Sequence, residues 1–145
     1  KLGGHPMIAY SIRFALKIKN IKKTIFSSDS RRYIKIAEKY GCKEFHFRSK
    51  RISTANASEH SVFLDYIKKQ IAIGNSLPKF FVHLRPTSPI RNKNSLEKAI
   101  IFFKKNQKKY SAVRSASKMS NPAYRSNRIV DGKLCSIIKK DFNNI

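Results

Sequence analysis

The sequence predicts an α/β fold, with a mainly parallel sheet, helices on both of its faces and a hairpin toward the carboxyl end. Short apolar runs of strand length alternate with segments whose apolar residues recur at helical spacing. Single helices separate successive strands, which implies right-handed crossovers and therefore parallel strands. The Asp131-Gly132 pair between apolar residues is typical of a hairpin turn. A length of 145 residues suits a single domain, residues 1–145.

The first helix is expected to run from Pro6, which a first helical turn tolerates, to about Lys19. One face of this helix is lined by four apolar residues: Ile8, Ile12, Ala15 and Leu16. Residues 23–27 follow as a short buried strand.

A second helix is expected after that strand, with Ser28 or Ser30 as its cap. Gly41 ends this helix, because glycine favours the left-handed conformation found at helix ends. Residues 42–47 are predicted as the second strand, and residues 47–57 as a polar loop.

Ser58 is the expected cap of a third helix, which Gly74 ends. Residues 79–84 are predicted as the central strand, because they form an apolar run of strand length. One more helix and one more strand complete this part, with Asn94 or Ser95 as the cap of the helix and residues 110–115 as the strand.

Residues 80–91 hold the most informative pattern. The apolar run stops at Pro86, because proline fixes φ and removes a backbone donor. The loop beyond it carries hydroxyls and lies between two arginines, Arg85 and Arg91. In open α/β sheets, ligands bind outside the carboxyl ends of the strands. Such a loop can therefore offer hydroxyl and guanidinium groups to a phosphate or a carboxylate.

The net charge of +24 invites a nucleic-acid interpretation. The lysines are scattered along every predicted helix, however, and do not form one arm or stripe. We therefore expect solvated basic faces and no nucleic-acid partner. The charge should instead speed encounters with anionic nucleotides in a salt-dependent way. A basic nucleic-acid-binding module stays open as an alternative.

Other functional classes find little support in the sequence. Cys42 and Cys135 lack the spacing of metal ligands, so we expect reduced thiols in a cytoplasmic protein. The four histidines show no metal-ligand spacing either. No apolar run has the length of a membrane span, and no membrane association is expected.

Four segments carry a family resemblance. Residues 84–91, Leu-Arg-Pro-Thr-Ser-Pro-Ile-Arg, are similar to the Leu-Gln-Pro-Thr-Ser-Pro-Leu-Arg signature of the acylneuraminate cytidylyltransferases, the CMP-sialic acid synthetase family. Residues 1–12 resemble the opening loop and first helix of that family, and residues 27–30 resemble its Ser-Thr-Asp-Ser turn. Residues 47–48, followed by 57–58, resemble its Leu-Arg-Pro and Asp-Thr-Ala-Ser segment. The order and approximate spacing of all four agree.

The resemblance implies a Rossmann-like nucleotide-diphospho-sugar transferase fold. It also implies cytidylyl transfer from CTP to a nonulosonate of the sialic, legionaminic or pseudaminic acid type, giving a CMP-sugar and pyrophosphate. Mg²⁺ is the implied cofactor, and its acidic ligands, the catalytic residues, the basic nucleotide loop and a dimerisation segment are expected outside residues 1–145. We therefore interpret the chain as a truncated cytidylyltransferase domain, inactive alone, from a protein that forms a homodimer.

The resemblance also singles out six residues for contact with the nucleotide or the sugar: Arg48, Ala57, Ser58, Arg85, Thr87 and Ser88. Arg48 is implied at the cytosine end, although a solvated basic loop is the alternative. Ser58 is implied near the base and ribose, or serves only as a helix cap. Asp29 either touches a ribose or metal or simply begins a helix. Arg91 either joins the site or faces solvent.

Several positions depart from the family pattern. Arg85 stands where the family often has glutamine, so any contact in which that glutamine accepts a hydrogen bond is lost. Ser49 and Ala55 replace a proline and an aspartate. Glu59 replaces a hydroxyl, and a carboxylate there would repel triphosphate unless a metal intervenes. These changes indicate a divergent member or another nonulosonate substrate.

Related nucleotidyltransferases of the same fold stay open as alternatives. The related Kdo cytidylyltransferases have an acidic loop, Gln-Gly-Asp-Glu-Pro, after the corresponding strand. Here the loop is Arg-Pro-Thr-Ser-Pro and has no acid, which favours the acylneuraminate type. A Kdo-type or GTP-using enzyme is the runner-up.

Overall fold

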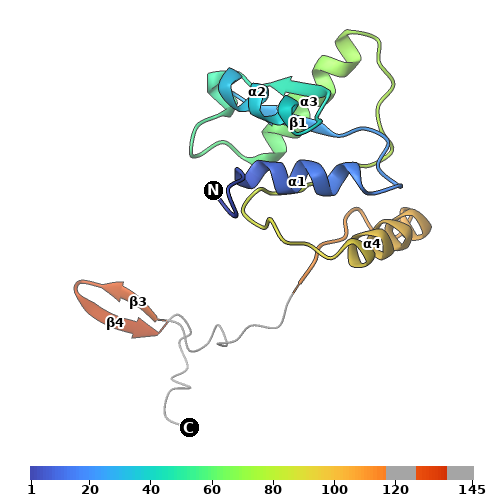
Figure 1. The fold of residues 1–145 in the computed structure, drawn as a ribbon. Coiled ribbons are helices and arrows are strands. Elements are labelled where there is room, and N and C mark those ends of the chain that lie inside the picture. Colours follow the sequence, from blue (N-terminus) through green and yellow to red (C-terminus); the bar gives the residue numbers. More distant parts are fainter. Residues whose placement is uncertain (117–126, 137–145) are drawn as a thin grey trace. The chain divides into compact units, whose positions relative to one another are not determined.

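The computed structural model describes residues 1–116 and 127–136 (Figure 1). The chain forms two compact units, Lys1–Gln107 and Lys108–Ile145. The first unit holds four α-helices and a parallel pair of strands, and the second holds a hairpin. No helix among the described residues is long and apolar enough to cross a membrane.

The parallel pair consists of β1 (Ile25–Ser28) and β2 (Glu44–Phe47). Its register places Phe26 beside Phe45 and Ser27 beside His46. Since side chains alternate along a strand, the two phenylalanines lie on one face of the pair and the two polar residues on the other. This alternation decides which helices cover which face.

Helices α1 (Met7–Leu16) and α2 (Arg31–Lys39) cover the phenylalanine face. Phe26 and Phe45 pack against a buried cluster formed by Ile12, Ala37 and Cys42. These apolar contacts form the core of the first unit, and burying such side chains is the main source of its stability.

The expected start of α1 and both expected ends of α2 are confirmed. Pro6 precedes α1, and Ser30 caps α2 by accepting a hydrogen bond from the Tyr33 amide at 3.4 Å. Gly41 follows α2 with φ +92, as a helix-ending glycine should. Helix α1 ends at Leu16, earlier than the expected end at about Lys19, and Leu16 is 51% exposed.

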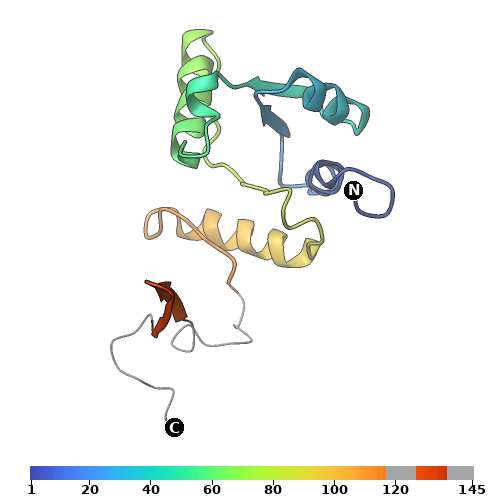
Figure 2. The same cartoon turned by 90° about the vertical axis from the view of Figure 1, so that its left-hand side faces the viewer.

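Helix α3 (Glu59–Ala72) contacts the polar face of the pair. Asp65 and Tyr66 of this helix both contact His46, so helices lie on both faces of the strands (Figure 2). A short 3₁₀ helix, Lys50–Ile52, lies in the preceding loop, and Ser58 caps α3 as expected. The predicted α/β class with a parallel sheet is therefore confirmed.

Two expected strands do not form. Residues 79–84 lie in irregular backbone, although they were expected to be the central strand, and the same is true of residues 110–115. Within the described part of the chain, β1 pairs only with β2, and a cavity lies between β1 and residues 79–84. An apolar run shows a tendency to burial, but a strand also needs a neighbour with which to exchange hydrogen bonds.

Helix α4 (Lys93–Asn106) begins earlier than expected. Its cap is Asn92, whose Oδ1 accepts from the Ser95 amide at 3.0 Å, so the expected caps Asn94 and Ser95 were wrong. Asparagine and serine have similar capping ability, and the local sequence does not distinguish among such neighbouring positions.

The second unit contains the antiparallel hairpin of β3 (Asn127–Val130) and β4 (Lys133–Ser136). Asp131 and Gly132 form its two-residue turn with φ of 49 and 74. Positive φ at both positions is the signature of the turn that suits the twist of paired strands, and the expected hairpin is confirmed.

Candidate functional site

A cavity of about 1340 Å³ lies within the first unit. Its walls come from α1, residues 20–24, β1, the end of β2, most of α3, residues 76–87 and the end of α4. Of the six predicted contact residues, the cavity brings three together: Arg48, Arg85 and Thr87. The other three do not line it: Ala57, Ser58 and Ser88.

Arg48 is positioned by the ends of both strands. It follows β2 directly, and its amide donates to the Ser28 carbonyl at 2.9 Å. Its Nη2 lies 3.5 Å from Oδ1 of Asp29. From the sequence, Asp29 was expected either to touch a ribose or metal or simply to begin a helix. Nε of Arg48 is buried and has no hydrogen-bond partner in the part of the chain that the structure describes. A buried donor of this kind costs free energy unless a ligand or solvent reaches it.

Ser58 acts as a helix cap in this structure. Its Oγ accepts from the Ser61 amide at 3.2 Å, and its carbonyl accepts from the Ser61 hydroxyl at 2.7 Å. Contact of Ala57 or Ser58 with a nucleotide stays a prediction.

Arg91 links the loop of residues 85–91, which contains two prolines, to α1. One guanidinium nitrogen, Nη1, donates to Oγ of Ser11 at 3.0 Å, and Nη2 donates to the carbonyl of Arg85. The guanidinium also lies 5.9 Å from the ring centre of Phe14. Burial lowers the pKa of Arg91. Arg91 therefore holds in place the loop that carries Arg85 and Thr87. Its guanidinium contacts protein groups and does not simply face solvent.

Glu59 and His83 lie beside Arg85 on the wall of the cavity. Nε of Arg85 donates to Oε1 of Glu59 at 2.7 Å, and Nη2 contacts the same oxygen. Nδ1 of His83 lies 3.6 Å from Oε2 of Glu59. The Glu59 carboxylate on the cavity wall is thus paired with the Arg85 guanidinium and is not an isolated negative charge.

A chain of polar side chains that the sequence did not predict begins at the same cavity. Oγ of Ser27 lies 3.0 Å from Nδ1 of His46, whose Nε2 lies 2.8 Å from Oδ2 of Asp65. Lys69 contacts that oxygen at 2.8 Å and lowers the pKa of Asp65, an effect to which His46 adds. The alternation of Phe with Ser and His in the two strands was the available indication that these polar groups share a face.

The described residues do not supply a metal site by themselves. Residues 1–116 and 127–136 contain no group of three or more His, Cys, Asp or Glu side chains that could hold an ion.

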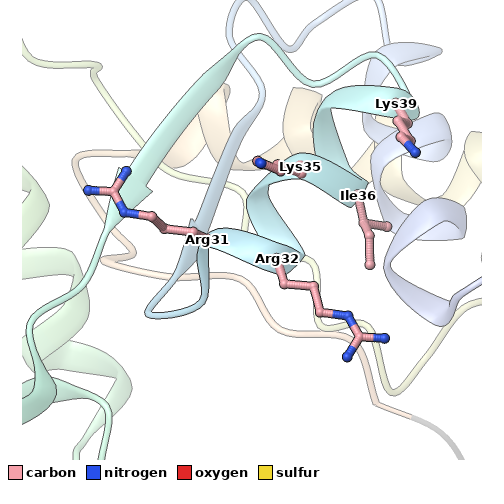
Figure 3. A pocket seen from close by; sticks show the side chains of 5 residues that line it. All are labelled: Arg31, Arg32, Lys35, Ile36 and Lys39. Carbon is pink, nitrogen blue, oxygen red and sulfur yellow. The ribbon is translucent and has the colours of Figure 1, made fainter.

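A second, smaller hollow of about 430 Å³ lies on α2 (Figure 3). Four cations and one apolar residue line it: Arg31, Arg32, Lys35, Ile36 and Lys39. All come from one helix, and the four charged groups point in different directions (Figure 3). The Arg31 guanidinium lies 5.1 Å from the ring centre of Phe47. This geometry is typical of a solvated basic face and does not converge on one ligand.

The chain is similar to proteins of one functional class. Residues 1–131 match the family model described as "Cytidylyltransferase". The N-acylneuraminate cytidylyltransferase of Escherichia coli is 29% identical over 138 residues, which are 95% of this chain and 31% of that protein. The pseudaminic acid cytidylyltransferase of Campylobacter jejuni is 36% identical over 110 residues, which are 74% of this chain and 46% of that protein.

A third relative comes from Campylobacter coli. Its "Post-translational flagellin modification protein B" is 28% identical over 134 residues, 92% of this chain and 57% of that protein. The chain thus spans from about a third to just over half of the length of these relatives.

Proposed function

We propose, because this chain belongs to the cytidylyltransferase family, that the native polypeptide carrying it transfers a cytidylyl group from CTP to a nonulosonate of the sialic or pseudaminic acid type. The anomeric hydroxyl of the sugar attacks the α-phosphorus and loses its proton to solvent water. The bond from that phosphorus to the bridging oxygen breaks, and pyrophosphate leaves. Negative charge builds on phosphate oxygens, so the site needs cations and hydrogen-bond donors.

One observation carries the proposal: Arg48 and Thr87 line the same cavity although they come from different loops of the fold. Arg48 stands at the end of β2, and Thr87 lies in the loop braced by Arg91. An arginine at the carboxyl end of a parallel strand, sharing a cavity with a loop hydroxyl, suits a nucleotide. In our proposal the Arg48 guanidinium contacts the nucleotide, and the Thr87 hydroxyl donates to a phosphate or sugar oxygen.

The remaining predicted contacts belong to the same proposal. The Ala57 backbone and the hydroxyls of Ser58 and Ser88 would reach the ligand only after a local rearrangement, because none of the three lines the cavity. Mg²⁺, when bound, would neutralise charge on the triphosphate, and its ligands are proposed to lie outside the described residues. We also propose that the native protein is a homodimer.

The test is an assay of pyrophosphate release by the native polypeptide with Mg²⁺. CTP is combined in turn with N-acetylneuraminic, legionaminic, pseudaminic and Kdo acids, and the other three nucleotides are compared with CTP. Release that needs CTP and one of the nine-carbon sugars is the expected result. Release with GTP or with Kdo alone would move the protein to a related nucleotidyltransferase class. No release, together with duplex or RNA binding at physiological salt, would replace the enzyme proposal with a nucleic-acid module.

A further inference from the structure

Two departures from the family pattern touch each other. Arg85 and Glu59 replace a glutamine and a hydroxyl, and they are 26 positions apart in sequence. Nε of Arg85 donates to Oε1 of Glu59 at 2.7 Å, and Nη2 contacts the same oxygen. Since each change alone would leave a new charge beside the cavity, their contact indicates that they function as one unit.

Both ends of this pair are fixed by the fold. Glu59 is the first residue of α3, where the positive end of the helix dipole favours a carboxylate. The carbonyl of Arg85 accepts from Arg91, which is itself anchored to Ser11 at 3.0 Å. The pair therefore has a defined place on the cavity wall, even though its two side chains are 60% and 52% exposed.

The contact changes what Arg85 can recognise. A single guanidinium facing a cavity attracts carboxylates and phosphates, but one already paired with a carboxylate has its charge compensated. Arg85 gives Nε and Nη2 to Glu59, which leaves Nη1 to donate to a ligand. Glu59 in turn supplies acceptor oxygens, which arginine itself lacks. Together they offer a donor and an acceptor side by side, as the amide of a glutamine does.

We propose that the Glu59–Arg85 pair determines substrate specificity by binding a neutral group that carries both a donor and an acceptor, and by disfavouring an anion at that position. This inference rests on the proposed cytidylyl transfer. Two parts of the substrates have the required chemistry: an acylamino group on the sugar and the amino-pyrimidine edge of the base. Both are neutral, and both match the paired donor and acceptor.

The test is a double-mutant cycle on kcat/KM in the native polypeptide, with Arg85→Gln, Glu59→Gln and the combined variant. Arg85→Gln removes the guanidinium donor and leaves the Glu59 carboxylate uncompensated at the position of the neutral group, and it is expected to lower kcat/KM about tenfold. The combined variant restores a neutral donor and acceptor and should return to within about threefold of the wild type. Additive losses in the combined variant would overturn the proposal.

A comparison of KM values for two sugars and for CTP shows whether the neutral group belongs to the sugar or to the base. The sugars are N-acetylneuraminic acid and its analogue with a hydroxyl in place of the acetamido group. If the pair binds the acylamino group, Arg85→Gln raises KM for the first sugar and leaves KM for the second unchanged. If the pair binds the base, only KM for CTP rises. A change in kcat alone would contradict either form of specificity.

Controls keep this test separate from the test of the enzyme itself. Lys93 and Glu97 form another ion pair, at 3.8 Å on α4, and neither lines the cavity. Glu97→Gln should leave every kinetic constant unchanged. If the wild type shows no turnover with any sugar, the proposed function fails. If the wild type is active and the cycle is additive, only the role of Glu59 and Arg85 fails.

Discussion

Nε2 of His46 lies 2.8 Å from Oδ2 of Asp65, which links the end of β2 to the middle of α3. His46 is only 4% exposed, and the other nitrogen of its ring, Nδ1, lies 3.0 Å from Oγ of Ser27. Buried polar groups are stable in a fold only when they are paired. The pairing of His46 thus explains how a polar face of the two strands can pack against a helix.

Acid should weaken this link through Asp65. Its pKa is lowered in the fold, mainly by the hydrogen bond from Lys69, so its ionised form contributes stability above the ordinary value of 3.8. That contribution is lost as the pH falls through the lower pKa of the folded state. We expect the thermal midpoint to drop below about pH 4 and to drop less in Asp65→Asn. Glu38→Gln, on the exposed face of α2, is the control, and equal acid profiles for all three proteins would contradict the prediction.

Arg48 should matter for nucleotide affinity. A hydrogen bond to a charged group contributes about 1.5–3 kcal/mol. Arg48→Ala is therefore expected to weaken CTP binding to the native polypeptide by about 10- to 100-fold in calorimetry. Arg51→Ala, in the neighbouring 3₁₀ helix, should bind CTP as the wild type does. Unchanged CTP affinity in Arg48→Ala would remove this residue from the site.

Gly41 should be hard to replace. Its φ is +92, and an added Cβ would lie 3.2 Å from Cδ1 of Leu16. Gly41→Ala is expected to cost about 1 kcal/mol or more in the free energy of unfolding, since both conformation and space oppose it. Gly74 has φ +72 but open space around the same position, so Gly74→Ala should cost less. Denaturant titrations measure the difference, and an equal cost would show that the Leu16 contact is irrelevant.

The two cysteines should react at different rates. Cys42 is 1% exposed, and burial raises the pKa of its thiol, so little thiolate is present near neutral pH. Cys135 is more accessible. Iodoacetamide followed by mass spectrometry should show Cys135 modified well before Cys42 in the native state, and at similar rates in urea. Rapid native labelling of Cys42 would contradict the buried core at this position.

The sequence predicted best what short-range chemistry decides. Ser30 and Ser58 cap helices, Gly41 ends one, and Asp131-Gly132 turns a hairpin, because each of these depends on backbone conformation within a few residues.

Features that depend on distant partners could not be predicted in the same way. Residues 79–84 have the composition of a buried strand, yet pairing depends on where β1 lies. The bond from Arg91 to Ser11 joins residues 80 positions apart, and the Glu59–Arg85 contact joins residues 26 apart. No local pattern reports such contacts, and the cavity brings together only three of the six predicted site residues.

The most direct measurement is a crystal structure of the native polypeptide with CTP. Our account predicts density for the nucleotide in the cavity, in contact with Arg48 and Thr87. Density for CTP only on the basic face of α2, beside Arg32 and Lys35, would contradict it.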